Sequence, residues 1–448
     1  MTCAAAHVVH HADCLVSSPG CAGPFRTTPC YSPMKILHLL STVDPRAGGP
    51  TEGVRQSGVA MASLGHEVEV ASLDAADAPH VRDFPLPVHA LGPGRNYYGF
   101  TPDFAPWLSR EAQRFDAVIV HGLWQYHGFG TWRALRASKV PYYVYTHGML
   151  DPYFKRTYPL KHLKKWAYWP WAEYRVLRDA AAVIFTTEEE RLLARQSFWL
   201  YRANERVVPF GTNPPPPHAQ ALREAFLSAY PALRGKRIVL FLGRIHEKKG
   251  CDLLIHAFAD HAQRDSEAHL VIAGPDATGW QRPLQALARS CGIEERIAWP
   301  GMLQGDLKWG AFYASDVFAL PSHQENFGVA VAEALACGLP VLLSDKVGVW
   351  REVENDHAGF VSSDTINGTQ RNLLNWHSLD AAAKGNMREQ ARRTFDARFG
   401  IESMIDSLTA LLQPQPAAAP RAADQQSPQN TPGAMPRKVP AQREPSVN

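Results

Sequence analysis

The chain alternates short, β-rich apolar runs with stretches of helical periodicity, and it does so in two successive sets. The first set of runs lies near residues 35–40, 67–73, 117–121, 142–146, 182–187 and 206–210, and the second near 237–242, 269–273, 297–299, 316–320, 340–343 and 359–362. Alternation of strands with helices is typical of parallel sheets that helices cover on both faces. We therefore predict an α/β protein with two Rossmann-like halves.

A proline run, Pro214 to Pro217, lies between the two sets. Such a segment suits a connection between domains, because a polyproline-like chain is semi-rigid. After the second set, apolar residues around Phe395, Phe399 and Met404 predict a last helix. The sequence thus divides into a Rossmann-like domain over 34–213, a linker over 214–235, a second Rossmann-like domain over 236–390 and a helical segment over 391–412.

The two ends of the chain differ from the rest. The start contains Cys3, Cys14, Cys21 and Cys30 but no CxxC pair, so we do not expect a metal site there. It also lacks the charged start and apolar core of a secretory signal, and we expect residues 1–33 to be a disordered or mis-annotated leader. Residues 413–448 are rich in Pro, Ala and Gln, cannot bury enough apolar surface to fold, and are expected to be a disordered tail.

Composition argues against several classes of protein. With 448 residues and 45% hydrophobic side chains, the chain can bury sizeable cores. A net charge of +3 is too slight a bias for a nucleic-acid-binding protein, and no zinc-finger, homeodomain or RNA-binding signature is present. No apolar run reaches the roughly 18 residues that a membrane span needs. The later cysteines, Cys251, Cys291 and Cys337, are typical of buried thiols in a cytosolic protein, so we expect a cytoplasmic location.

The segment PSHQENFGVAVAEALACGLPV, residues 321–341, carries two glutamates on either side of a predicted helix start. The run from Val329 to Ala336 has high helix propensity, so the helix N-terminus follows a loop that ends at Gly328. Free N–H groups there would bind an anion such as a diphosphate without a metal ion. Glu325 before the helix and Glu333 within it suit hydrogen bonds to sugar or ribose hydroxyls. The alternative, that both are ordinary surface charges, remains open from this segment alone.

A basic loop, GRIHEKKG at 243–250, follows the strand predicted at 237–242. It presents Arg244, Lys248 and Lys249 before a helix with apolar residues at helical spacing. Strand, basic loop and helix form a phosphate-binding layout, in which fixed cations would stabilise the charge that grows on a departing diphosphate. The alternative is a solvated Lys-Lys-Gly turn.

Taken together and in this order, the two motifs resemble the donor-site motifs of retaining glycosyltransferases of family GT4, also called glycosyltransferase group 1. The resemblance covers roughly residues 34–412. It implies the GT-B fold, in which two Rossmann-like domains face each other across a deep cleft and a C-terminal helix crosses back to the first domain. It also implies that the first domain binds the acceptor and the second a nucleotide-sugar.

The resemblance assigns roles to individual residues of the second half. It implies that Arg244 and Lys249 hold the donor diphosphate, that Glu325 touches the transferred sugar, and that Glu333 holds the nucleotide ribose. Contacts to sugar, phosphate and base would come from the backbone or surroundings of Asn326, Phe327, Gly328, Val329, Gly301 and Met302. Many relatives have Gly at the position of Asn326.

Two further candidate sites lie in the first half. Gly48 and Gly49 follow the first strand, with Pro50 suited to the first helical turn. In the family such a loop closes on the donor phosphates, whereas the sequence alone is equally consistent with a tight strand-to-helix turn. His147 ends a strand in YVYTHGML, at the sheet edge where active-site groups gather. Because family members often place a His there beside sugar and acceptor, His147 is a catalytic candidate, and His121, at the end of the preceding strand, is a secondary one.

Residues 155–171, KRTYPLKHLKKWAYWPW, combine lysines and an arginine with tryptophans. Basic residues beside aromatic residues suit the surface of an anionic membrane. Such a contact would place the protein peripherally on the inner face of the plasma membrane, close to a lipid-linked acceptor. The alternative, which we favour from the sequence, is a solvated basic face whose tryptophans pack into the core.

The reaction that the resemblance implies is metal-independent, retaining transfer of a hexosyl group from a UDP- or GDP-sugar to a hydroxyl of a glycan or lipid-linked glycan, as in polysaccharide or lipopolysaccharide biosynthesis. No cofactor is expected beyond the sugar nucleotide as co-substrate. Two alternatives stay open: a sugar-nucleotide epimerase of the same fold, and a catalytically silent subunit that binds a nucleotide-sugar.

Overall fold

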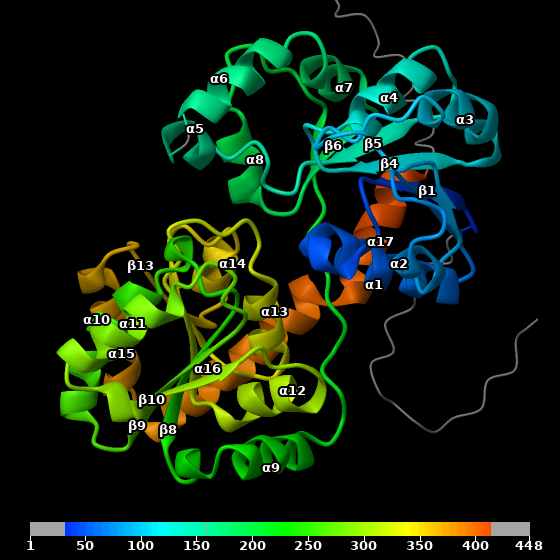
Figure 1. The fold of residues 1–448 in the computed structure, drawn as a ribbon. Helices are drawn as coiled ribbons and strands as arrows, with labels where there is room; N and C mark the ends of the chain where they lie inside the picture. The colour runs from blue at the N-terminus through cyan, green and yellow to red at the C-terminus, as the bar shows by residue number, and fades with distance from the viewer. Residues whose placement is uncertain (1–31, 158, 414–448) are drawn as a thin grey trace, which may run out of the picture. The chain divides into compact units, whose positions relative to one another are not determined.

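The computed structural model of the protein describes residues 32–157 and 159–413. The predictions of a disordered leader and a disordered tail fall almost wholly outside these residues. Contacts group the described residues up to Leu411 into one compact unit, which holds two parallel sheets (Figure 1). Within the described ranges, no helix is both long enough and apolar enough to cross a membrane.

The first sheet has the strand order β3-β2-β1-β4-β5-β6-β7, and every neighbouring pair is parallel. The central strands β4, β5 and β6 are buried along their whole length, which is why their sequences read as continuous apolar runs. The strand β3 was not predicted, because three half-buried residues are too few to show a period. The strands are β1 Lys35–Leu40, β2 Glu67–Ser72, β3 Val88–Ala90, β4 Ala117–His121, β5 Tyr142–Tyr145, β6 Ala182–Phe185 and β7 Glu205–Val207.

Helix α1 begins where the sequence predicts it. Gly48 precedes its first turn and Pro50 lies within that turn. An added Cβ on Gly53 would lie 2.4 Å from the ring of Phe210, so close packing on this face of α1 requires glycine. The helices of the first half are α1 Gly49–Ser63, α2 Pro79–Arg82, α3 Phe104–Glu111, α4 Tyr126–Leu135, α5 Tyr153–Thr157, α6 Pro159–Tyr168, α7 Glu173–Asp179 and α8 Glu188–Ala194.

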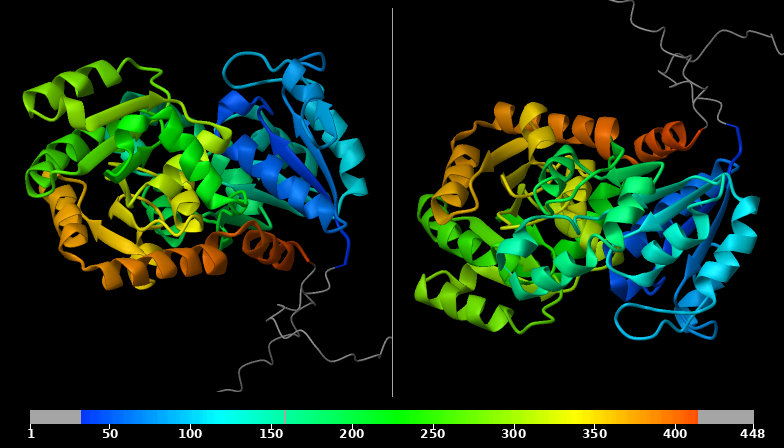
Figure 2. Two further views of the ribbon diagram at one scale, coloured as in Figure 1. Left: turned by 90° about the horizontal axis from the view of Figure 1, so that it is seen from below. Right: turned by 90° about the horizontal axis from the view of Figure 1, so that it is seen from above.

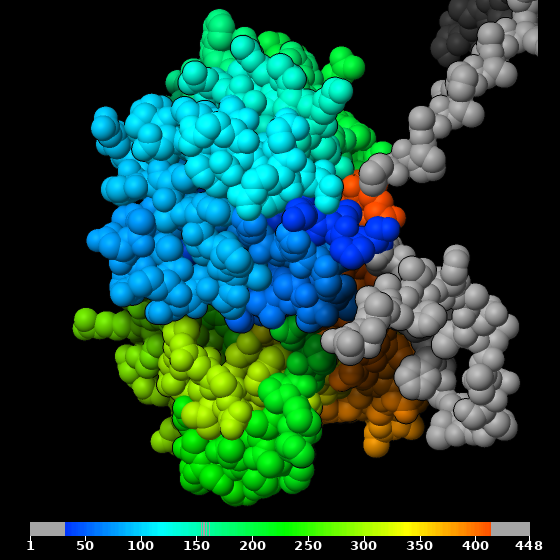
Figure 3. All heavy atoms as spheres, turned by 90° about the vertical axis from the view of Figure 1, so that its right-hand side faces the viewer, coloured from blue at the N-terminus to red at the C-terminus, as the bar shows by residue number. Residues whose placement is uncertain are grey.

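The second sheet has the order β10-β9-β8-β11-β12-β13 and is also parallel throughout. In both sheets the first strand lies inside, between the second and the fourth, which is the doubly wound arrangement that the alternating pattern predicts. Figure 3 shows one face of the molecule, on which atoms of the first half, in blue and cyan, meet atoms of the second half, in green and yellow. The strands are β8 Arg237–Leu242, β9 Ala268–Ala273, β10 Ile297–Gly301, β11 Val317–Leu320, β12 Val341–Ser344 and β13 Gly359–Ser362.

Each sheet has its own hydrophobic core. Leu37, Val118 and Val144 belong to the first core, whereas Leu240 and Phe318 belong to the second. Helix α13 covers the residues that propensity predicts. The helices of the second half are α9 Ala219–Ala229, α10 Cys251–Arg264, α11 Gln281–Ser290, α12 Gly305–Ala314, α13 Val329–Ala336, α14 Trp350–Asn355, α15 Ile366–Ser378, α16 Ala381–Thr394 and α17 Ile401–Leu412.

The last helical segment returns to the first half, as the family resemblance implies. A π-helical turn, Phe395–Phe399, interrupts it between α16 and α17. The N–H of Ile401 donates to the carbonyl oxygen of Thr212 at 3.0 Å, and the N–H of Gly211 donates to Sδ of Met404 at 3.2 Å. Figure 2 shows α16 and α17, coloured orange to red, running from the second sheet to the first.

The tryptophans of the basic segment do not all pack into the core, which corrects the alternative that we favoured. Trp169 is fully buried, but Trp166 and Trp171 are 47% and 69% exposed. Leu160 and Leu163, on α6, are 81% and 63% exposed. The physical reason is that α6 is short and amphipathic, and among the residues of this segment whose burial is described, Trp169, just beyond the end of α6, is the one large side chain that is fully buried. Part of α6 therefore presents an apolar face to the surface.

Candidate functional site

Two loops lie against each other at the carboxyl ends of the paired strands β8 and β11. We call residues 243–250 the basic loop and residues 321–328 the glutamate loop. Gly250 has a φ of +67°, and an added Cβ would lie 2.2 Å from the carbonyl oxygen of Pro321. Only glycine permits this approach. It brings the basic loop directly beside the glutamate loop.

Lys249 and Glu325 form an ion pair between these two loops. Their side chains are 11% and 21% exposed, so the pair is largely shielded from water. Burial lowers the pKa of Lys249 to about 7, and the charges of Lys248 and Arg244 act in the same direction. The structure thus joins two predicted site residues that lie 76 positions apart, with Arg244 near enough to influence the same ammonium group.

The N-terminus of α13 lies next to this ion pair. Gly328 precedes the helix with a φ of +86°, and no side chain caps the first turn. An added Cβ on Gly328 would lie 3.4 Å from Cγ of Glu325. Uncapped N–H groups at a helix start, beside the ammonium of Lys249, form an arrangement that can bind an anion.

Glu333 is buried on α13 and pairs with a lysine that the sequence does not single out. Nζ of Lys308, on α12, lies 2.5 Å from Oε1 of Glu333. Burial raises the pKa of Glu333, Lys308 opposes that rise, and the charge of Glu52 adds to it. Since Glu52 lies in the first turn of α1, the start of that helix comes close to the Lys308–Glu333 pair.

Other predicted residues lie at open positions. Arg244 and Met302 are exposed. An added Cβ on Gly48, Gly49 or Gly301 would meet no atom within 4 Å. These positions have room for a ligand, and the contacts that the family resemblance implies for them stay predictions.

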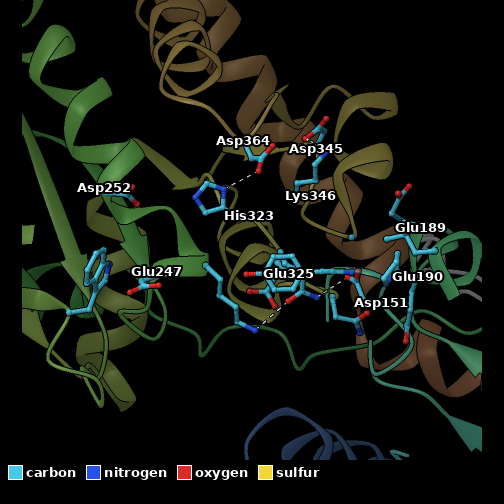
Figure 4. A pocket seen from close by; sticks show the side chains of 18 residues that line it. Asp151, Glu189, Glu190, Glu247, Asp252, His323, Glu325, Asp345, Lys346 and Asp364 are labelled. Carbon is cyan, nitrogen blue, oxygen red and sulfur yellow. Dashed lines mark hydrogen bonds and ion pairs between the residues drawn. The ribbon is translucent and has the colours of Figure 1, made fainter. Parts of the chain in front are cut away.

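A cavity of about 700 Å³ lies between side chains of the two halves (Figure 4). Glu325 and Asn326 line it, whereas Arg244, Lys249 and Glu333 do not. Acidic groups dominate its wall, as Figure 4 shows. The first half contributes Asp151, Glu189 and Glu190, and the second half contributes Glu247, Lys248, Asp252, His323, Asp345, Lys346 and Asp364.

Polar contacts join the two halves at this cavity. Nε2 of Gln324 donates to Oδ2 of Asp151 at 3.0 Å, and Nδ2 of Asn326 donates to Oγ1 of Thr186 at 3.1 Å. The guanidinium of Arg351 lies 2.8 Å from the carboxylate of Glu189. The residue after Glu325 therefore touches the first half directly.

His147 lies just after β5, in the first half. Its φ is +48°, an uncommon value for a residue other than glycine. Burial lowers its pKa to about 4, so the imidazole is neutral at pH 7. The next residue, Gly148, packs so tightly on Asn326 that an added Cβ would lie 2.7 Å from its amide. Nε2 of His147 lies 3.0 Å from Nδ1 of His121.

Two family models together match most of the chain. The glycosyl transferase 4-like domain matches residues 48–211, and glycosyl transferases group 1 matches residues 223–394. The chain belongs to the GT4-type glycosyltransferases. The boundary between the two matched segments includes the proline run that the sequence places between its halves.

Curated relatives of this GT4-type chain are similar over part of their length. A D-inositol 3-phosphate glycosyltransferase of Nocardia farcinica is 34% identical over 199 residues, which are 42% of this chain and 43% of the relative. The chain therefore spans less than half the length of this relative.

Solved structures match the GT4-type chain over nearly its whole described length. Sucrose-phosphate synthase of Thermosynechococcus elongatus has a TM-score of 0.65 at 21% identity and covers 84% of this chain and 98% of its own. Anabaena HepE in complex with UDP-glucose has a TM-score of 0.66 at 18% identity and covers 85% of this chain and 99% of its own. At such identities the likeness shows the fold alone, and the predicted GT-B fold is confirmed.

Sequence reasoning missed several polar partners in this GT4-type site. No sequence motif distinguishes Lys308, because it is one lysine on a helix and contacts Glu333 only through tertiary packing. Asp151 was missed for the same reason. Gln324 could have been found, since it precedes Glu325 in the quoted motif and its amide both donates to Asp151 and accepts from Nζ of Lys248 at 3.3 Å.

Proposed function

We propose that the protein transfers a hexosyl group from a UDP- or GDP-sugar to a hydroxyl of a glycan or lipid-linked glycan, with retention of configuration and without a metal ion, in polysaccharide or lipopolysaccharide biosynthesis. The observation that carries this proposal is the Lys249–Glu325 ion pair beside the uncapped N-terminus of α13. Cationic and carboxylate groups side by side suit a ligand that has a diphosphate at one point and hydroxyls at the next.

In the proposed reaction, the diphosphate of the donor binds to Lys249, Arg244 and the first N–H groups of α13. The bond between the anomeric carbon and the diphosphate oxygen breaks, and its electron pair leaves with the diphosphate. Fixed cations stabilise that growing charge most strongly in the transition state. An acceptor hydroxyl forms the new bond from the same face, and its proton passes to a departing phosphate oxygen.

The ends of the donor are held by the two glutamates. Glu325, which lines the cavity, accepts hydrogen bonds from hydroxyls of the transferred sugar. Glu333 accepts them from the ribose, and Lys308 opposes the rise that burial causes in the pKa of its carboxyl group. His147 faces the sugar and the acceptor from the first half.

The solved relative HepE, bound to UDP-glucose, makes UDP-sugars the first donors to test. The curated relative named for D-inositol 3-phosphate adds a phosphorylated polyol to the acceptors worth testing beside glycans. Release of nucleoside diphosphate from a donor panel, measured with and without acceptors, separates the alternatives. Release that depends on an acceptor supports the transferase. Acceptor-independent formation of free or isomerised sugar indicates an epimerase, and binding without release indicates a silent subunit.

A second part of the proposal concerns the membrane. Residues 152–172 contain no Asp or Glu, and this stretch exposes Leu160, Leu163, Trp166 and Trp171. Lys155 and Lys164 are also exposed there. Apolar side chains flanked by lysines suit the headgroup region of an anionic bilayer. We propose that α6 lies on such a surface and brings a lipid-linked acceptor to the cavity.

A further inference from the structure

Histidines from three neighbouring strands form one hydrogen-bonded row in the first half. Nδ1 of His38, in β1, lies 2.8 Å from Nε2 of His121, at the end of β4. Nδ1 of His121 lies 3.0 Å from Nε2 of His147, which follows β5. Successive ring centroids are 5.1 and 5.3 Å apart. Both ring nitrogens of His121 are therefore committed to other histidines.

Burial keeps the row neutral at pH 7. It lowers the pKa of His38 and of His147 to about 4, and it lowers the pKa of His121 well below its usual range. A neutral imidazole carries one N–H donor and one bare nitrogen acceptor. In a row of neutral rings, the tautomer of one ring dictates that of the next. Only two arrangements then satisfy both hydrogen bonds, and they run in opposite directions.

The inner end of the row distinguishes the two arrangements. Nε2 of His38 is buried and has no hydrogen-bond partner among the described residues. In the inward arrangement, each ring donates toward His38, and this nitrogen would carry a proton and would be a buried donor without an acceptor. In the outward arrangement, each ring donates toward His147, so that Nε2 of His38 carries no proton and only its lone pair lacks a partner. Orphaned buried N–H groups are rarer in proteins than under-satisfied acceptors, so the outward direction is favoured.

In the outward arrangement, Nδ1–H of His38 donates to Nε2 of His121, and Nδ1–H of His121 donates to Nε2 of His147. The proton of His147 is then on Nδ1. His147 is partly exposed, and its Nδ1 has no hydrogen-bond partner among the residues that the structure describes. That N–H is open to a ligand.

We propose that His38 and His121 are positioning residues that hold His147 as a neutral Nδ1–H donor to a sugar or acceptor hydroxyl, rather than as a base. The role at the hydroxyl rests on the function proposed above, but the tautomer does not. A donor at this point fixes the orientation of a hydroxyl without taking its proton. This agrees with a reaction in which the departing phosphate accepts the acceptor proton.

The test is nitrogen NMR of the full chain with labelled histidine at neutral pH, with the His147 signals assigned from His147→Gln. We expect Nδ1 of His147 to be the protonated nitrogen and Nε2 to be bare. A proton on Nε2, or a charged imidazolium, would overturn the proposal. This measurement needs no turnover, so its outcome is separate from whether the protein transfers sugar at all.

Two substitutions of His38 test the positioning role. His38→Asn can keep an N–H near the former Nδ1, whereas His38→Phe keeps a ring but removes the donor. We expect His38→Phe to give a mixture of His147 tautomers and to lower kcat about tenfold, as for the loss of one hydrogen bond, and His38→Asn to restore both. An unchanged spectrum and kcat in His38→Phe would show that the row does not position His147. If neither variant folds, the spectrum of the unaltered chain still decides.

Discussion

Lys249, on the loop after β8, pairs with Glu325, on the loop after β11, at the start of α13. The two loops also meet in the close contact between Gly250 and the backbone of Pro321. In this chain of the GT4-type family, a cation and a carboxylate thus lie beside a helix start that no side chain caps.

The contact at Gly250 can be tested by comparing two glycines of similar backbone conformation. Gly250 and Gly235 have φ values of +67° and +74°, but only Gly250 has an obstacle, at 2.2 Å, to an added Cβ. Gly235→Ala should cost about 1 kcal/mol of unfolding free energy for its backbone alone. Gly250→Ala should cost about 2–4 kcal/mol, because the two loops must also separate. Urea unfolding measures both, and equal losses would show that the loops do not depend on this contact.

Glu173 on α7 should make stability depend on pH. Burial raises its pKa to about 7, while Oε1 accepts a hydrogen bond from the N–H of Trp124 at 2.7 Å and Oε2 has no partner among the described residues. The folded chain therefore holds this proton more tightly than the unfolded chain, and stability falls as pH rises from about 4.5 to 7.

Glu173→Gln should remove that slope and leave the protein about 2–3 kcal/mol more stable than the unaltered chain at pH 8. Denaturant unfolding at pH 5 and pH 8 measures the difference. The same slope in both proteins would contradict the assignment.

Glu333 should determine the affinity for the ribose of the donor nucleotide. The unaltered protein should bind UDP more tightly than deoxy-UDP, by about 1.5–3 kcal/mol for a hydrogen bond to a carboxylate. Glu333→Gln should lose most of that preference, because its carboxylate, paired with Lys308, becomes a neutral amide. Glu389→Gln, at an exposed position on α16, serves as the control. Calorimetric titration measures the affinities of each protein for UDP and for deoxy-UDP. If Glu333→Gln prefers UDP as strongly as the unaltered protein does, Glu333 does not bind the ribose.

The apolar face of α6 should carry membrane binding. Leu160→Ser combined with Leu163→Ser should abolish co-flotation with vesicles of anionic phospholipid, since both side chains are exposed and would insert among headgroups. Leu374→Ser, at a 45% exposed position on α15, should float like the unaltered protein. Equal flotation of all three proteins would reject the membrane contact.

The sequence predicts the fold well because periodicity is a local signal. All but one strand and the extent of α13 follow from apolar runs and helix propensity, whereas β3 is too short to show a period. The two motifs carry Lys249 and Glu325, and the chain topology brings them together. The contact of Lys308 with Glu333 and the histidine row cannot be predicted from the sequence, because each depends on the packing of elements far apart in the chain. The exposed tryptophans were misjudged because an amphipathic segment does not reveal which face is covered.

The most direct test of the account is the turnover of Arg244→Ala and Glu325→Ala with the best donor and acceptor from the panel, alongside Glu389→Gln as the control and with thermal unfolding to confirm that each variant is folded. The account predicts that both lower kcat at least about a hundredfold, while the control does not change it. Arg244→Ala removes a cation that stabilises the charge developing on the diphosphate, and Glu325→Ala removes the hydrogen bonds that orient the transferred sugar. Near-normal turnover in both folded variants would contradict the claim that the two loops grip a sugar diphosphate.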